Sequence, residues 1–127
     1  MLKTILMSVL LMAGSSQVMA EWVKISRNEQ SVFYINTPIQ KKAGSNVMIW
    51  ILRDHTELRH GPAGPYLSSK DQIEVDCAGR RIRRMYSSDH PQAMGAGKLV
   101  HYEHGPMSWN FATPHTIASR MVDIACG

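Results

Sequence analysis

The sequence lacks the short motifs that mark most recognised hydrolytic and metal-dependent enzymes. It contains no Gly-x-Ser-x-Gly turn and no His-Glu-x-x-His pair. Its six histidines do not have the spacing of a zinc site and are expected on the surface. Residues 94–98 contain two glycines and a lysine, but they lack the spacing of a phosphate-binding loop. We therefore expect no enzymatic activity, no bound metal and no cofactor.

Long apolar runs and strong charge are also missing. The apolar stretch 4–14 has 11 residues, whereas a helix needs about 20 to cross a bilayer. Lysine and arginine together number 14 against 10 aspartate and glutamate residues, which gives a formal net charge of +4. This balance is far weaker than the concentrated basic face of a nucleic-acid-binding domain. The sequence therefore predicts neither a membrane span nor a nucleic-acid partner.

Residues 1–20 have the pattern of a secretory signal peptide. Lys3 precedes the apolar stretch, and Val18 and Ala20 are small residues at the cleavage positions. Removing this segment takes away Lys3 and leaves residues 21–127 as one small domain of net charge +3. Ser15 stands where a bacterial lipoprotein would carry its cysteine. We therefore expect an exported protein, periplasmic or at the cell surface, without a lipid anchor.

The chain has two cysteines, Cys77 and Cys126, and both lie in the predicted mature part. An even number of cysteines in an exported chain predicts a disulfide, because the compartment is oxidising. The two positions are 49 residues apart, so a bridge would stabilise the fold by about 4 kcal/mol by restricting the unfolded chain. We expect Cys77 and Cys126 to be joined.

Short alternating segments between turn residues predict an α+β domain built on an antiparallel sheet of about six strands in meander order. The predicted strands are residues 22–26, 32–36, 46–54, 66–77, 80–88 and 97–103. Residues 55–65 are rich in glycine and proline and predict a loop. Residues 94–98 are interpreted as a connector between strands.

Two segments predict helical structure. Thr37 and the proline after it indicate a short helical turn that ends at Gly44. Residues 113–125 predict a C-terminal helix, with Thr113 as its cap and Pro114 as its first residue. An apolar stripe along this helix indicates that it packs against the sheet.

Residues 47–52 form an unbroken apolar run that predicts a central strand. Because alternate side chains point to opposite faces of a sheet, both faces need cover, and one helix covers one face. The other face is therefore a candidate dimer interface. Trp50 and Trp109 are expected to be core or interface residues rather than stacking platforms for a sugar.

Strands 66–77 and 80–88 form the best-defined hairpin in the sequence. A two-residue turn at Ala78 and Gly79 sets an apolar pair between two ion pairs. The predicted pairs are Asp76 with Arg81, Val75 with Ile82 and Glu74 with Arg83. A three-residue loop would place apolar residues opposite charged ones, so the two-residue register is favoured, with a bulge as an open alternative.

Residues 80–84 contain the densest charge in the chain. The hairpin register gives Arg81 and Arg83 a carboxylate and leaves Arg80 and Arg84 without one. Arg80 and Arg84 are therefore the candidate site for an anionic partner, such as an anionic glycan, lipopolysaccharide or an acidic protein surface. The alternative interpretation is a solvated strand face of little energetic weight.

Several segments, taken in order, resemble the bacterial surface-adhesin protein E family. They are residues 20–24, 32–35, 37–38, 47–50, 68–70, 74–77, 80–81, 94–98, Trp109 and 126–127. The most specific are Ser-Ser-Lys leading to Asp-Cys at Cys77 and the terminal Cys-Gly. The resemblance covers nearly the whole predicted mature chain.

The resemblance implies an antiparallel sheet packed by a C-terminal helix, tied by the disulfide, in a homodimer exported by a Gram-negative bacterium. It also implies non-enzymatic binding of host matrix or serum proteins at the cell surface. Anionic envelope components are a further possible partner class. The alternative hypothesis is a periplasmic structural or envelope-stress protein with no adhesin role, because a shared fold does not fix a function.

Overall fold

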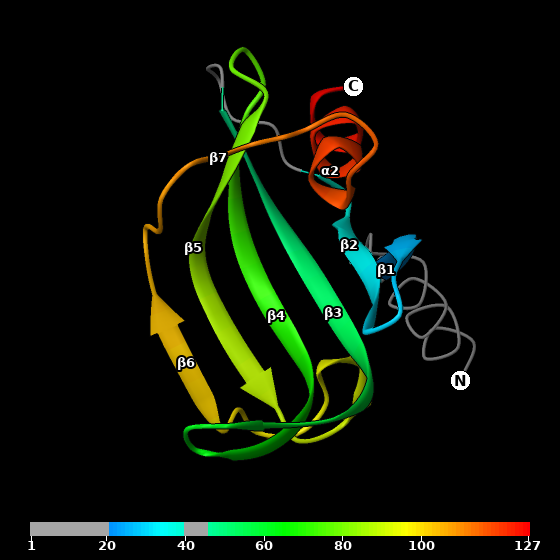
Figure 1. Ribbon diagram of the computed structural model, residues 1–127, viewed down its shortest axis with the longest axis vertical. Helices are drawn as coiled ribbons and strands as arrows, with labels where there is room; N and C mark the ends of the chain where they lie inside the picture. Colours follow the sequence, from blue (N-terminus) through cyan, green and yellow to red (C-terminus); the bar gives the residue numbers. More distant parts are fainter. Residues whose placement is uncertain (1–20, 40–45) are drawn as a thin grey trace, which may run out of the picture.

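The computed structural model describes residues 21–39 and 46–127. Its elements are β1 (Glu21–Arg27), β2 (Ser31–Thr37), β3 (Asn46–Gly61), β4 (Gly64–Asp76), β5 (Arg81–His90), η1 (Ala93–Gly95), β6 (His101–His104), β7 (Asn110–Phe111) and α2 (Ile117–Cys126). Strands β1 to β6 lie side by side in chain order, all antiparallel, and β7 pairs with β5 (Figure 1). This meander, with one C-terminal helix and one disulfide, confirms the predicted α+β fold class.

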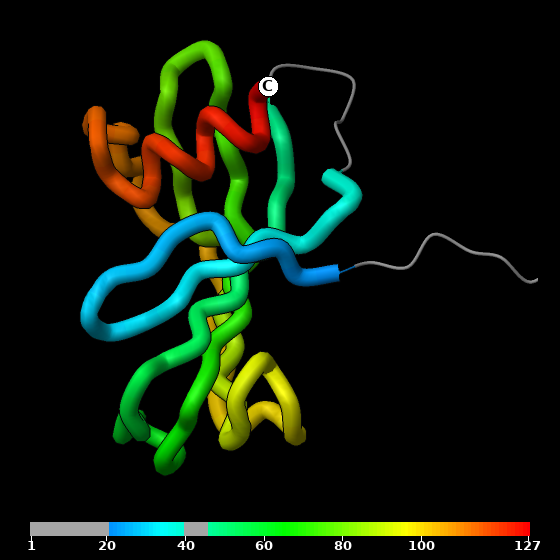
Figure 2. Tube along the Cα trace, turned by 90° about the vertical axis from the view of Figure 1, so that its right-hand side faces the viewer, coloured from blue at the N-terminus to red at the C-terminus, as the bar shows by residue number. Residues whose placement is uncertain are grey.

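The hydrophobic core lies between one face of the sheet and α2. Val47, Ile49 and Ile51 of β3 are at most 5% exposed, and they cluster with Met121 and Val122 of α2. Because successive side chains of a strand point to opposite faces, α2 covers the face that these three residues share. Figure 2 shows α2 on one side of the sheet and η1 on the other side, toward the opposite end.

The opposite face of β3 carries Trp50 and Leu52. Leu52 is fully buried, whereas Trp50 is 37% exposed and is not a core residue. The η1 segment covers Leu52 closely: Gly95 has φ +71, and a Cβ at this position would lie 3.4 Å from Leu52 and overlap Lys70. Residues 94–98 are thus a packed connector between β5 and β6. It covers the Leu52 end of this face and leaves Trp50 accessible.

The β4–β5 hairpin has the predicted register, but its turn spans residues 77–80 rather than Ala78 and Gly79 alone. The pairs are Asp76 with Arg81, Val75 with Ile82 and Glu74 with Arg83. Both predicted ion pairs are present, with Arg81 Nε 2.8 Å from Asp76 and Arg83 Nε 2.7 Å from Glu74. The hydrogen bond from Arg81 holds the pKa of Asp76 below its ordinary value. A bulge interrupts the pairing farther along β4.

The prediction of a loop over residues 55–65 is wrong. Strand β3 runs to Gly61, β4 begins at Gly64, and these two glycines face each other across a turn. Gly64 has φ +121, which a residue with a side chain rarely adopts. The glycines and prolines occupy the tip of a long hairpin, and residues 56–60 of its arm are mostly exposed. A strand whose side chains remain in water lacks the apolar alternation that sequence patterns detect.

The C-terminal helix begins later than predicted. Thr116 is the N-cap of α2, which starts at Ile117, and its Oγ1 accepts a hydrogen bond from the Ser119 amide at 3.2 Å. Thr113 is not the cap; its carbonyl accepts a hydrogen bond from the Thr116 hydroxyl. The predicted start fails because His115 has φ 65, outside the right-handed helical region.

Two further predicted boundaries differ from the structure. Thr37 belongs to β2 and therefore does not cap a helical turn. Residues 40–44 of that predicted turn lie outside the described residues. The predicted strand 97–103 shortens to β6, because Gly97, with φ +86, belongs to the connector that precedes it.

Candidate functional site

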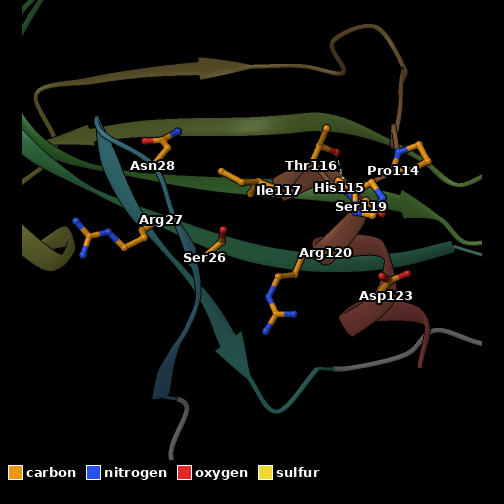
Figure 3. A pocket seen from close by; sticks show the side chains of 10 residues that line it. All are labelled: Ser26, Arg27, Asn28, Pro114, His115, Thr116, Ile117, Ser119, Arg120 and Asp123. Atoms are coloured by element: carbon orange, nitrogen blue, oxygen red, sulfur yellow. Dashed lines mark hydrogen bonds between the residues drawn. The ribbon is translucent and has the colours of Figure 1, made fainter.

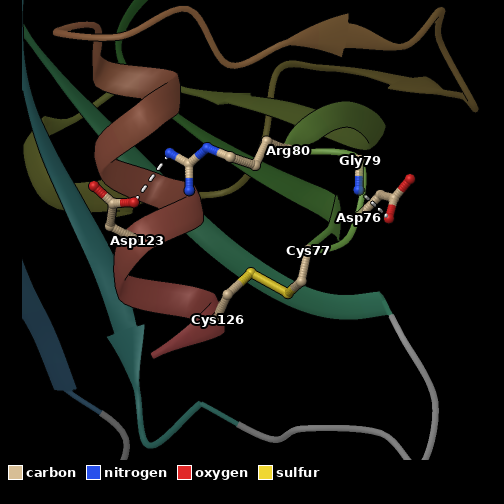
Figure 4. Close-up of a disulfide and its surroundings, with 6 residues drawn as sticks. All are labelled: Asp76, Cys77, Gly79, Arg80, Asp123 and Cys126. Atoms are coloured by element: carbon tan, nitrogen blue, oxygen red, sulfur yellow. Dashed lines mark hydrogen bonds and ion pairs between the residues drawn. A yellow bond between two sulfur atoms is a disulfide. The ribbon is translucent and has the colours of Figure 1, made fainter.

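A disulfide ties the β4–β5 turn to the end of α2 (Figure 4). Cys77 follows β4 and Cys126 is the last residue of α2; their Cα atoms lie 5.7 Å apart. The bridge confirms the predicted pairing. Cys77 comes two positions after the buried Val75, just beyond the end of β4, and both cysteines pack against the hydrophobic core. The bridge therefore helps to hold α2 over this face of the sheet.

Arg80 lies in the same turn and forms a second connection to α2. Its guanidinium donates to Asp123 Oδ1 at 3.0 Å (Figure 4). It also donates to Ser119 Oγ at 3.1 Å. The prediction that Arg80 has no carboxylate is therefore wrong. The partner comes from α2, 43 positions away, where a hairpin register gives no information. The pair is exposed, with 49% of the Arg80 side chain and 64% of the Asp123 side chain accessible.

Arg84 also has a carboxylate partner, contrary to prediction. Its Nε lies 3.6 Å from Asp71 Oδ1. Asp71 is 1% exposed, and stronger contacts already hold it: two hydrogen bonds from Arg53, at 2.6 and 3.1 Å, and one from Ser87 at 2.7 Å. Burial alone would lower the pKa of Arg53, but the attraction of Asp71 outweighs it and raises that pKa. Arg84 is thus a loosely held outer member of this cluster, and 42% of its side chain is exposed.

A cleft of about 720 Å³ lies between the β1–β2 turn and the start of α2 (Figure 3). Its lining includes Arg27 from the end of β1 and Arg120 from α2, with Asp123 as the carboxylate of the lining. Arg120 Nε donates to the Ile25 carbonyl, which anchors that side chain to β1. Within the described ranges, Arg27 and Arg120 form no ion pair. Since Arg80 already neutralises Asp123, the cleft has uncompensated positive charge.

We call Arg27, Arg80, Arg84 and Arg120 the arginine group. All four belong to the α2 side of the molecule: two border the cleft, Arg80 contacts α2, and Arg84 contacts Asp71, which shares a face of β4 with the core residues. Guanidinium groups bind carboxylates, sulfates and phosphates with directional hydrogen bonds. The chemistry of these four side chains therefore suits an anionic ligand.

The sequence did not indicate Arg27 and Arg120 as site residues. They are 93 positions apart in the chain, and neither belongs to a charge cluster or a motif. Only the packing of α2 beside β1 makes them line the same cleft. Arg80 and Arg84 could be predicted as candidates because they are close together in an arginine-rich segment. In the structure, however, they form ion pairs with different carboxylates.

His55 belongs to a buried polar chain rather than to the surface. Ser31 Oγ lies 2.8 Å from its Nδ1 and Ser69 Oγ lies 3.0 Å from its Nε2. Ser69 in turn donates to Asp89 at 2.7 Å, so the Ser69 oxygen accepts the Nε2 proton and Ser31 donates to Nδ1. Burial is the main cause that lowers the pKa of His55 to about 4, and nearby arginines lower it further. The expectation of surface histidines is wrong here and at His90, which is also buried.

Residues 21–39 and 46–127 contain neither a metal-binding cluster nor a helix that could span a membrane. No group of three or more histidine, cysteine, aspartate or glutamate side chains in these ranges could hold a metal ion. In the same ranges, no helix has the length and apolar character needed to cross a membrane.

Comparison with known protein families matches residues 22–127 to the family described as surface-adhesin protein E. No protein with a curated description matches the sequence significantly. Among solved structures, the fold is similar to that of protein E from Haemophilus influenzae. One structure has a TM-score of 0.63 at 13% identity, covering 87% of this chain and 86% of that chain. A second crystal form of the same protein has a TM-score of 0.64 at 13% identity, covering 87% of this chain and 90% of that chain. Protein E from non-typeable Haemophilus influenzae has a TM-score of 0.62 at 14% identity, covering 87% of this chain and 78% of that chain.

Proposed function

Because the chain belongs to the surface-adhesin protein E family, we propose that it is an exported, non-enzymatic binding module that attaches to an anionic partner through the arginine group. The observation that carries the proposal is the charge imbalance of the cleft. Arg27 and Arg120 line it without a carboxylate of their own, and the carboxylate in the lining is already paired with Arg80. A negatively charged ligand would complete this arrangement.

Arg80 can exchange its internal partner for a ligand at little cost. An exposed ion pair of this kind contributes at most about 1 kcal/mol to stability, and both side chains of the Arg80–Asp123 pair are about half exposed or more. The disulfide fixes the turn that carries Arg80. A ligand carboxylate, sulfate or phosphate would thus meet a guanidinium whose backbone is already in place.

Arg84 extends the proposed surface along β5. Its distance of 3.6 Å from Asp71 is too long for a good hydrogen bond, and Arg53 and Ser87 satisfy that carboxylate without it. The Arg84 side chain is therefore free to turn toward an external anion. The partners that fit are host matrix or serum proteins with acidic surfaces, or anionic envelope components.

The test measures binding of the folded protein, residues 21–127, to two immobilised probes, a basement-membrane extract and heparin. We expect saturable binding that weakens between about 50 and about 500 mM salt, because exposed charges are screened over about 8 Å at physiological ionic strength. Replacing Arg80 and Arg84 together by alanine should weaken binding about tenfold, since each exposed contact contributes up to about 1 kcal/mol. The free energy of unfolding should change little.

The matched control is the Arg81→Ala/Arg83→Ala protein. This variant also loses two positive charges, but they come from the opposite face of the sheet, where each arginine is paired with a carboxylate of β4. Its binding to both probes should remain within about twofold of wild type. Equal affinity of wild type and the Arg80→Ala/Arg84→Ala protein at both salt concentrations would contradict the proposed site.

Export and self-association belong to the same proposal. The pattern of residues 1–20 supports export by a signal peptide, and the homodimer rests on the family resemblance. Sedimentation of residues 21–127 measures the oligomeric state directly. The alternative, a periplasmic structural protein without an adhesin role, predicts no affinity for either probe.

A further inference from the structure

The sheet face opposite α2 presents a continuous array of aromatic rings. Trp50 of β3, Gln72 of β4, Tyr86 of β5 and His104 of β6 follow one another in register across four strands. Neighbouring strands lie about 4.8 Å apart, so this row spans about 14 Å. Tyr102, two residues before His104, is 54% exposed and widens the row at the sheet edge. We call these five residues the aromatic row.

The rings of the aromatic row contact one another. The centroids of Trp50 and Tyr86 are 6.0 Å apart with the planes at 72°, and those of Tyr86 and Tyr102 are 6.3 Å apart and nearly parallel, at 26°. His104 lies 5.2 Å from Tyr86 and 5.4 Å from Tyr102. Such ring pairs restrain one another's rotation. The apolar surface of the row is therefore ordered before any ligand arrives, which lowers the entropic cost of binding.

The aromatic row carries no lysine, arginine or carboxylate. The two arginines beside it are paired internally: Arg81 with Asp76 at 2.8 Å and Arg83 with Glu74 at 2.7 Å. Lys70 lies on the same face, two residues before Gln72, and forms no ion pair within the described residues; its stem packs closely against Gly95 of the connector. Both guanidinium groups also lie 4.3 Å from the centre of the Trp109 ring, which holds them in place. The side chains of the aromatic row thus add no permanent charge of their own, unlike the arginines of the cleft beside α2. The row complements an uncharged ligand.

Polar groups are interleaved with the rings. Among the residues that the structure describes, the Trp50 indole N–H, the Gln72 amide and the Tyr86 and Tyr102 hydroxyls have no hydrogen-bond partner. The polar atoms of Gln72 and Tyr86 are not buried, and Trp50 and Tyr102 are exposed residues. They are donors and acceptors that face water next to exposed ring surfaces. A sugar offers the matching combination, because a pyranose has an apolar C–H face and a rim of hydroxyl groups.

We propose that the aromatic row is a binding surface for an uncharged oligosaccharide. Sugar C–H faces pack on the rings of Trp50 and Tyr102, and sugar hydroxyls exchange hydrogen bonds with Gln72 and the tyrosine hydroxyls. A row that spans four strands suits several linked sugars rather than a monosaccharide. The surface lies on the side of the sheet away from α2, so it is separate from the arginine group. It is the face that the sequence predicted as a dimer interface, and it contains Trp50, which was expected to be a core or interface residue but is 37% exposed. The proposal therefore requires that two copies of the chain meet at another surface.

The test titrates residues 21–127 with three neutral hexasaccharides: β-1,4-linked glucose, α-1,4-linked glucose and β-1,4-linked N-acetylglucosamine. Calorimetry measures affinity, and NMR follows the indole N–H of Trp50. We expect saturable binding of at least one probe, unchanged at about 500 mM salt. Trp50→Ala and Tyr102→Ala should each weaken binding about tenfold, as truncation of a buried aromatic anchor does. Tyr102 lies on the edge strand, so this variant remains informative if Trp50→Ala fails to fold.

Two control variants isolate the surface. Leu58→Ala removes an apolar side chain that is 49% exposed on the β3–β4 hairpin, away from the aromatic row, and it should bind the probe as wild type does. The Arg80→Ala/Arg84→Ala protein should also bind normally, which separates this proposal from the function proposed above. Absence of saturable binding at millimolar concentrations of all three probes would overturn the proposal. So would equal binding by wild type and Tyr102→Ala, or a dimer that Trp50→Ala dissociates, since the row would then be a contact between two copies.

Discussion

Lowering the pH toward 5 should destabilise this protein through one buried side chain, His55. The imidazole is 6% exposed and lies between the hydroxyls of Ser31 and Ser69. Protonation would place a charge in this buried chain, with Arg53 and Arg59 near enough to oppose it. The pKa of His55 is therefore lowered to about 4 in the folded protein, against an ordinary value of about 6.5 in the unfolded chain.

The magnitude follows from linkage between protonation and folding. Between about pH 6.5 and 4 the unfolded chain binds a proton at His55 that the folded protein does not, so stability falls as the pH falls through this window. The stabilisation from the neutral imidazole is fully present above about pH 6.5. At pH 5 the loss amounts to up to about 2 kcal/mol. Most aspartate and glutamate side chains remain ionised at this pH, which isolates the histidine contribution.

Urea unfolding at about pH 8 and about pH 5 measures this loss. The comparison is between wild type and His55→Gln, which removes the titrating group, and His60→Gln serves as the matched control because His60 is exposed. His55→Gln is expected to be less stable at pH 8 but to lose about 2 kcal/mol less than wild type between the two pH values. His60→Gln should retain the wild-type pH dependence. NMR should show the His55 ring neutral at pH 5, with its proton on Nε2. A His55 pKa near 6.5, or the same pH dependence in wild type and His55→Gln, would refute the reasoning.

Two further predictions concern the attachment of α2. Mass analysis of the oxidised protein should show Cys77 linked to Cys126 with no free thiol, and reduction should lower the free energy of unfolding by about 2 to 5 kcal/mol, because the bridge closes a long loop; two free thiols would contradict the pairing. Thr116→Ala should destabilise by about 1 kcal/mol in urea unfolding through loss of the N-cap. Thr113→Ala should have a smaller effect, since the part of Thr113 that contacts Thr116 is its carbonyl; equal effects would restore Thr113 as the cap.

The β4–β5 hairpin shows what local sequence can predict. Its register follows from two ion pairs around an apolar pair, and every one of these contacts joins residues within 9 positions of each other. The disulfide was predictable for a different reason, because the chain has two cysteines and one pairing. A contact can therefore be predicted from the sequence when its two residues are close in the chain, or when only one pairing is possible.

The errors arise where a distant part of the chain decides the local structure. Residues 56–60 extend a hairpin arm into solvent, where no apolar period marks a strand. His55 is polar but buried, because serines of β2 and β4 satisfy both of its ring nitrogens. Nothing within a window of the sequence around His55 contains that information.

The candidate site could be predicted only in part, because residues distant in the chain complete it. The charge of Arg80 and Arg84 was evident from their neighbours, but the carboxylates that they contact, Asp123 and Asp71, come from other elements. Arg27 joins the site through the packing of α2 beside β1. The aromatic row assembles in the same way from β3, β4, β5 and β6. The sequence gives the chemical type of each of these residues, but the register of the sheet determines which of them are in contact.

The measurement that tests the central claim most directly is adherence of intact bacterial cells to immobilised basement-membrane extract. It compares cells that express the wild-type protein, cells that express Arg80→Ala/Arg84→Ala at the same level, and cells without the protein. Protease treatment of the intact cells, followed by detection of the protein, reports whether it is exposed at the surface. The proposed function predicts that wild-type cells adhere most, that the double variant loses most of this gain, and that protease removes the protein. Equal adherence of all three strains, with the protein untouched by protease, would contradict an adhesin and favour a role inside the envelope.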